Sequence, residues 1–227
     1  ALILGVLHGP WREARPSYLS NQMPRTYATK PNPAVRFWRR RGLLPKEVEV
    51  LDVIARRARH ALAQVPPPVA GTVVLGDSRD LETIPSVPGG YAWVVTSPPY
   101  YGMRSYNPDQ WLRLWFLGGP TTVQYDRTGQ VRHRWQEYMD DLAHVWRNVA
   151  ARCRAGARLV VRFGCLPTGA RDPVGLLLAT LERSGAPWRV MSVADAGAPP
   201  RGRRQADQFG RPRGPVTEVD VIAELAG

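Results

Sequence analysis

Residues 97–100 read Ser-Pro-Pro-Tyr and follow Thr96 and the apolar run 91–95. The two prolines have a fixed φ and no N–H, so this corner of the chain is stiff, and the residue before a proline stays extended. The Ser97 hydroxyl is a further hydrogen-bond acceptor, and Tyr100 offers a flat face on which a base can stack. Such a corner could hold a planar amine by two acceptors and turn its lone pair toward an incoming methyl group.

The same letters have two other interpretations. Pro98-Pro99-Tyr100-Tyr101 fits the PPxY pattern of peptides that WW domains bind. Those peptides usually lie in proline-rich, disordered segments, whereas this one follows a predicted strand. A strand-to-helix turn without any function is the other alternative.

The corner resembles the catalytic motif of S-adenosylmethionine-dependent DNA amino-methyltransferases. Members that act on the exocyclic amine of cytosine typically carry Ser before Pro-Pro, whereas adenine-specific members more often carry Asp or Asn. The segment 73–80, Val-Val-Leu-Gly-Asp-Ser-Arg-Asp, precedes the corner at a distance that fits the same family. The resemblance covers roughly residues 70–225 and implies cytosine N4 in DNA as the target.

Roles for individual residues follow from that resemblance. It implies that Asp77 accepts a hydrogen bond from the adenine amine of S-adenosylmethionine. The implied cofactor-binding residues are Gly76, Asp77, Ser78 and Thr96. The implied catalytic residues are Ser97, Pro98, Pro99 and Tyr100.

The charge of the chain points to a polyanionic partner. The formal net charge is +12, from 31 basic and 19 acidic residues, and residues 1–60 hold twelve of the basic and four of the acidic ones. Clustered Arg is typical of proteins that contact nucleic-acid phosphates, although an Arg-biased composition would also explain it. We predict DNA as the partner, with these candidate nucleic-acid-binding residues: Arg25, Lys30, Tyr101, Arg104, Tyr106, Arg203 and Arg204.

Hydrophobic periodicity predicts an α/β protein. Strands are expected at 72–77, 91–97, 158–163, 188–194 and 219–225, and helices at 1–9, 47–63, 108–117, 136–154 and 173–184. This alternation predicts a partial Rossmann-like methyltransferase sheet of parallel strands that ends in an antiparallel pair. We expect a basic, Pro/Arg-rich segment at 1–66, with its helix at 47–63, and a catalytic portion at 67–227.

One part of the family pattern is missing from the sequence. A glycine-rich turn after the first strand, Phe-x-Gly-x-Gly in the family, lets the backbone approach the cofactor, and no strand-helix unit of this chain carries one. We therefore expect the chain to be the C-terminal portion of a larger enzyme that lacks the central first strand. The missing N-terminal half, or a partner subunit, would supply the glycine motif. The chain alone would then be inactive and bind the cofactor weakly.

Other features limit the alternatives. The two cysteines form no CxxC pair, which favours a reducing, cytoplasmic setting, and neither follows a proline, as the nucleophile of cytosine ring-carbon methylases does. No pattern of metal ligands is present. Methylation of an RNA base remains open, and so does a non-catalytic, basic module that only binds nucleic acid.

Overall fold

The computed structural model describes most of the chain in separate ranges. These are residues 2–7, 19, 31–42, 44, 47–64, 68–101, 106–123, 131, 134–164, 172–197 and 218–227. Within these ranges we find no helix with the length and apolar character that crossing a lipid bilayer requires. The chain divides into two compact units, which are described separately.

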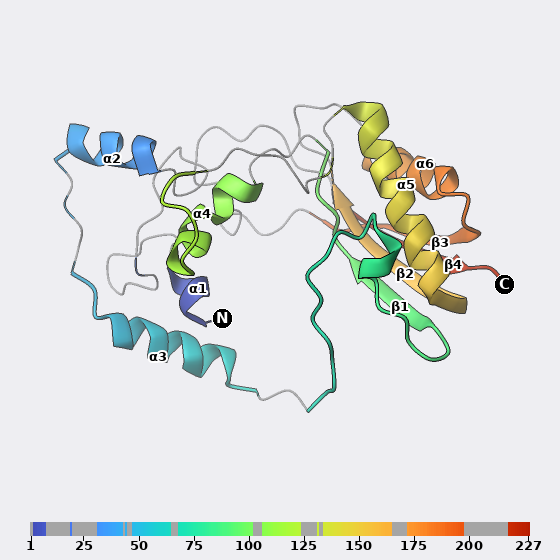
Figure 1. The fold of residues 1–227 in the computed structure, drawn as a ribbon, viewed down its shortest axis with the longest axis horizontal. Helices are drawn as coiled ribbons and strands as arrows, with labels where there is room; N and C mark the ends of the chain where they lie inside the picture. The colour runs from blue at the N-terminus through green and yellow to red at the C-terminus, as the bar shows by residue number, and fades with distance from the viewer. Residues whose placement is uncertain are drawn as a thin grey trace. The chain divides into compact units, whose positions relative to one another are not determined.

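The observed elements follow the predicted order closely (Figure 1). The helices are α1 (Leu2–Val6), α2 (Pro31–Arg40), α3 (Val50–Ala61), α4 (Tyr106–Phe116), α5 (Trp135–Arg152) and α6 (Pro173–Arg183), with a 3-10 turn η1 (Leu81–Thr83). The strands are β1 (Tyr91–Thr96), β2 (Cys153–Gly164), β3 (Trp188–Asp195) and β4 (Glu218–Leu225). The predicted elements at 1–9, 47–63, 91–97, 108–117, 136–154, 158–163, 173–184, 188–194 and 219–225 are thus confirmed with shifted ends.

The strands form a four-stranded sheet in the order β1-β2-β4-β3. β1 pairs with β2 in parallel, and β4 runs antiparallel to both of its neighbours, β2 and β3. The expected antiparallel end of the sheet is therefore confirmed. β4 is inserted between the two strands that precede it in the chain, and β1 lies at one edge.

Two helices cover one face of this sheet (Figure 1). Alternate residues of β2 and β4 point toward α5 and α6 and are buried, as the two-residue period of a strand requires. Two indole N–H groups in or beside this core are hydrogen-bonded: Trp146 Nε1 donates to Thr180 Oγ1 at 2.9 Å, and Trp188 Nε1 donates to the Trp146 carbonyl at 3.1 Å. Asp172 caps α6 by accepting from the backbone N–H groups of Val174 and Gly175.

The opposite face is more open near β1. Trp93 and Val95 are 63% and 75% exposed there, while Val94 between them packs against the core. Further along the sheet this face carries two cross-strand ion pairs, Arg158–Glu224 at 2.9 Å and Arg162–Asp220 at 2.6 Å. The helices therefore bury one face of the sheet, while part of the other face is apolar and exposed.

The predicted strand at 72–77 is wrong. These residues are described but belong to no strand, and Val73 and Leu75 are fully exposed. An extended segment becomes a strand only when a neighbour pairs with its backbone N–H and C=O groups. The sheet of the described residues offers this segment no such neighbour.

The other unit is helical. Its described elements are α1–α4, where Val6 of α1 and Val53 of α3 are buried and Arg113 Nε of α4 donates to the Leu4 carbonyl at 3.1 Å. Helix α2 at 31–40 was not predicted from the sequence. Its prolines lie in the first turn, where a missing N–H costs nothing.

Candidate active site

The corner after β1 is fixed to helix α5. Ser97 is exposed, whereas Pro98 is buried and Pro99 half-buried. The Tyr138 hydroxyl of α5 donates a hydrogen bond of 2.6 Å to the Pro99 carbonyl. One acceptor of the corner is therefore used to anchor it, and among the described residues nothing hydrogen-bonds to the exposed Ser97 hydroxyl.

Tyr100 lies at the end of strand β2. Its ring packs edge-on against Phe163, with ring centroids 6.2 Å apart and an angle of 72° between the planes. Next to Phe163, a Cβ built on Gly164 would lie 3.1 Å from Cε2 and Cζ of Tyr100. Because Gly164 has no side chain, the ring of Tyr100 can lie directly against the backbone of β2.

Tyr101 packs on the other side of the corner. Its ring makes edge-on contacts with Trp135 and Tyr138, at centroid distances of 5.1 and 5.2 Å. It is half-buried against the main core. In this position Tyr101 supports the corner, and its predicted contact with nucleic acid stays a prediction.

The Asp77 carboxylate is bound by a neighbour in its own loop. Arg79 donates to Oδ1 from its backbone N–H and from Nε, both at 3.0 Å. It donates to Oδ2 from Nη2 at 2.6 Å and from Nε at 3.1 Å. The side-chain hydrogen bond from Arg79 lowers the pKa of Asp77 below its ordinary value of 3.8, against a smaller, opposite effect of burial. Asp77 is thus a carboxylate near neutral pH and accepts hydrogen bonds only.

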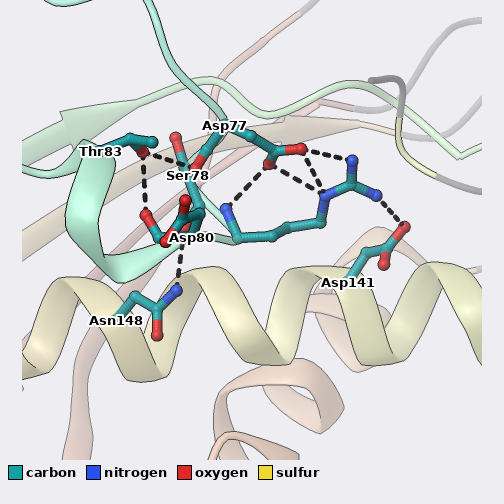
Figure 2. Close-up of polar contacts among 7 residues, drawn as sticks. Asp77, Ser78, Asp80, Thr83, Asp141 and Asn148 are labelled. Atoms are coloured by element: carbon teal, nitrogen blue, oxygen red, sulfur yellow. Dashed lines mark hydrogen bonds and ion pairs between the residues drawn. The ribbon is translucent and has the colours of Figure 1, made fainter. Parts of the chain in front are cut away.

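The loop that carries Asp77 is also fixed to α5 (Figure 2). Arg79 Nη1 donates to Oδ2 of Asp141 at 3.1 Å, and Asn148 Nδ2 donates to the Ser78 carbonyl at 3.2 Å. The loop closes on itself where Thr83 Oγ1 donates to the Asp77 carbonyl at 2.6 Å. Several independent contacts therefore hold this loop against one helix.

Gly76 has a steric role in the same loop. A Cβ at this position would lie 2.5 Å from Cβ of Thr83, which is closer than real contacts allow. The glycine lets Thr83 pack directly against the backbone at the start of the loop. Thr96, the remaining predicted cofactor-binding residue, is half-buried and pairs with Val161 in the sheet.

One face of α5 thus organises both predicted site segments. Tyr138, Asp141 and Asn148 lie at the helical spacing i, i+3 and i+10, so they share a face. Tyr138 and Asp141 are separated by three residues, which is about 4.5 Å along the helix axis. The structure therefore brings the corner at 97–100 and the loop of Asp77 to neighbouring turns of α5.

Most of the predicted nucleic-acid-binding residues cannot be placed. Arg25, Lys30, Arg104, Arg203 and Arg204 lie outside the described residues. Tyr106 begins α4, which belongs to the helical unit. The structure therefore adds nothing to these assignments.

Sequence reasoning missed Tyr138, Arg79, Asp141 and Gly164. The first three were visible only as polar residues in a predicted helix and a predicted turn, and their partners lie about forty to sixty residues away along the chain. The sequence did contain a sign of the role of Asp141. An acidic residue on the apolar face of a helix is energetically costly unless a cation pairs with it, so its position predicts a buried partner. Among the described residues no cluster of three or more potential metal ligands is found.

The comparisons with known proteins give only a distant likeness. A scan against protein-family models found no match, and a search of curated proteins found none. Among solved structures the chain is similar to TTHA0409 of Thermus thermophilus, which carries the name "Putative DNA Modification Methylase". Its selenomethionine form is 19% identical, with a TM-score of 0.37, over 67% of this chain and 51% of that one. Its complex with S-adenosyl-L-methionine is 20% identical, with a TM-score of 0.38, over 67% and 54%.

The chain thus spans about half the length of these structures. At this TM-score the likeness carries no conclusion about function. The function proposed below rests on this chain's own residues.

Tyr138→Phe removes the hydroxyl that holds the Pro99 carbonyl. We expect a loss of about 1 kcal/mol in the free energy of unfolding, because a partly buried carbonyl loses its donor. Urea unfolding measures it. Tyr91→Phe is the matched control, since among the described residues nothing hydrogen-bonds to the Tyr91 hydroxyl, and equal effects of the two variants would contradict the anchoring role.

Gly164→Ala places a methyl group against the ring of Tyr100. We expect Tyr100 to move and stability to fall by roughly 1 kcal/mol, the low end of an overpacking cost. NMR shifts of the Tyr100 ring protons report the movement. Gly71→Ala, where a Cβ meets nothing within 4 Å, should leave both unchanged, and an unmoved Tyr100 ring in Gly164→Ala would refute the contact.

Proposed function

We propose that this chain is part of an S-adenosylmethionine-dependent methyltransferase that modifies the exocyclic amine of a DNA base, with cytosine N4 as the target. The observation that supports it best is that helix α5 holds two segments on one face. Tyr138 anchors the Ser-Pro-Pro-Tyr corner, and Asp141 and Asn148 anchor the loop of Asp77. An amine-methylating site needs these two parts close together, one to orient the target amine and one to hold the methyl donor.

The corner would orient the target amine. With the Pro99 carbonyl bound to Tyr138, the acceptors for the amine are the Ser97 hydroxyl and the Pro98 carbonyl. These two accept the amine hydrogens and turn the nitrogen lone pair out of conjugation with the ring. The nitrogen becomes acidic once it is alkylated, so its proton leaves to these acceptors or to water without a strong base. Fixed geometry supplies most of the acceleration.

Tyr100 would bind the target base by stacking. Its phenol ring lies against Phe163 and Gly164, so it is held in place before a base arrives. A base inside a duplex cannot reach such a corner, and therefore the target nucleotide must be flipped out. A stacking contact of this kind contributes on the order of 1–3 kcal/mol.

The described residues fit the adenine end of S-adenosylmethionine. The Asp77 side chain is 42% exposed and is ionised at neutral pH, so it can accept from the adenine amine. When bound, the cofactor supplies a methyl group activated by its sulfonium. A glycine-rich turn after a strand, which would let the backbone approach the rest of the cofactor, is absent from the part of the chain that the structure describes.

We propose that the strand followed by a glycine-rich turn, which the described residues lack, lies beside β1. Trp93 and Val95 are exposed on the face of the sheet away from α5 and α6, and one edge of β1 pairs with no described strand. Val73 and Leu75 are exposed just upstream in the chain. Such an edge is an aggregation hazard unless another segment covers it. We propose that further polypeptide, in the same chain or in a partner subunit, adds a strand here and carries the glycine-rich turn.

Helix α2 supports DNA as the partner. Arg39 and Arg40 are adjacent in the last turn of the helix and are exposed. Exposed, clustered Arg side chains are suited to contact the phosphates of a polyanion. These charges also support a second candidate, a basic module that binds nucleic acid without catalysis, which would need no cofactor.

Ser97→Ala tests the proposed reaction. We expect the rate of methyl transfer to fall roughly tenfold or more, because one acceptor of the amine is lost, while the affinity for DNA is kept. Transfer of labelled methyl groups measures the rate, and fluorescence anisotropy measures the affinity for DNA. Both are measured with the full-length gene product. The exposed Ser86→Ala is the control. Equal losses of rate and affinity in Ser97→Ala would contradict the assignment.

The double variant Arg39→Gln/Arg40→Gln tests the contact of α2 with DNA. Each lost phosphate contact should reduce the slope of log affinity against log salt concentration by about 0.9, so two contacts reduce it by roughly 1.8. Anisotropy with a labelled duplex measures it across a salt series. Arg154→Gln/Arg189→Gln removes the same charge from exposed sites in the sheet unit. If both double variants change the slope equally, only net charge matters and α2 is not the contact.

A further inference from the structure

We propose that Arg79 and Asp141 are positioning residues, which hold the Asp77 carboxylate in the place and orientation where it accepts the amine of an adenine ring. This inference rests on the proposed role of Asp77 in binding the cofactor. Neither Arg79 nor Asp141 needs to touch the cofactor. Their effect passes through Asp77.

The Arg79 guanidinium bridges the carboxylates of Asp77 and Asp141 (Figure 2). Arg79 donates to both oxygens of Asp77 through Nε and Nη2, and its third nitrogen, Nη1, donates to Asp141. A planar fork that binds one carboxylate by two bonds fixes the plane of that carboxylate. The bond to Asp141 then fixes the fork relative to helix α5.

Asp141 is much more deeply buried than Asp77. Its side chain is 4% exposed, against 42% for Asp77. A buried carboxylate is strongly disfavoured unless a cation pairs with it. Moving Arg79 away from Asp141 would therefore be energetically costly. Arg79 thus connects an accessible carboxylate, Asp77, to a buried one, Asp141.

Asp77 has room for one more hydrogen bond. A carboxylate has about four lone-pair sites, and three N–H groups of Arg79 donate to them, because the single Nε–H is shared between Oδ1 and Oδ2. An adenine amine can therefore take the remaining site without displacing Arg79. The bond from Arg79 to Asp141 keeps the guanidinium in place while the amine enters.

The test compares two neighbouring acids on α5. Asp141→Asn keeps the shape of the side chain and removes its charge. Asp140→Asn is the matched control, because Asp140 pairs with Arg183 at the exposed surface and makes no hydrogen bond or ion pair with the described residues of the Asp77 loop. The probes are adenosine and purine riboside, which differ only in the 6-amino group, and their dissociation constants are measured in the protein as encoded.

We expect the wild type and Asp140→Asn to bind adenosine about tenfold tighter than purine riboside, the factor expected for a hydrogen bond to a carboxylate. Asp141→Asn should lose that preference, whereas a general loosening of the site would weaken the binding of both nucleosides equally. An unchanged preference in Asp141→Asn would overturn the inference. No preference in the wild type would instead overturn the proposed role of Asp77.

A second measurement needs no ligand. Amide hydrogen exchange over residues 77–83 should accelerate at least several-fold in Asp141→Asn and stay as in the wild type in Asp140→Asn, while strands β2 and β4 stay protected in both. Unchanged exchange in Asp141→Asn would show that Asp141 does not hold the loop. This result decides the positioning role even if the nucleosides do not bind.

Discussion

The candidate site depends on one face of helix α5. Tyr138 holds the backbone of the Pro-Pro corner, and Asp141, through Arg79, holds the carboxylate of the neighbouring loop. The two residues lie on adjacent turns of a helix that is itself packed by Trp146 and Leu142 into the core. The relative position of the two segments is therefore set by a rigid element and not by the loops themselves. This is how a loop-borne site gains precision.

The methyl transfer that we propose for this site depends more on the position of its groups than on their reactivity. No residue of the corner is a strong base, and the pKa of Asp77 is lowered, which suits an acceptor and not a general base. Transfer of an activated methyl group to an amine asks for an oriented lone pair and a held donor. A stiff corner and a fixed carboxylate meet those needs. The uncovered side of β1 is where such a site would be completed.

Local sequence patterns predicted most of this fold. Apolar spacing placed α5, α6 and the strands β1–β4, and the antiparallel end of the sheet was also predicted. The segment 72–77 was predicted as a strand and is not one, because strand formation depends on a pairing partner that its own residues do not encode. Helix α2 was not predicted, because the prolines at 31 and 33 were read as part of an irregular segment, whereas the helix begins at the first of them. The corner at 97–100 and the loop of Asp77 were predicted as site segments from the sequence, but the residues that hold them were not, because Tyr138 contacts the corner and Asp141 contacts the loop across long sequence separations.

The most direct test of the central claim is the identity of the methylated nucleoside. The encoded protein is expressed in cells that lack other DNA methylases, and the DNA and RNA are digested to nucleosides and analysed by mass spectrometry, for the wild type and for Ser97→Ala. We predict 4-methylcytosine in DNA with the wild type and its loss with the variant. Methylation confined to RNA, methylation at a ring carbon, or no difference between wild type and variant would contradict the account.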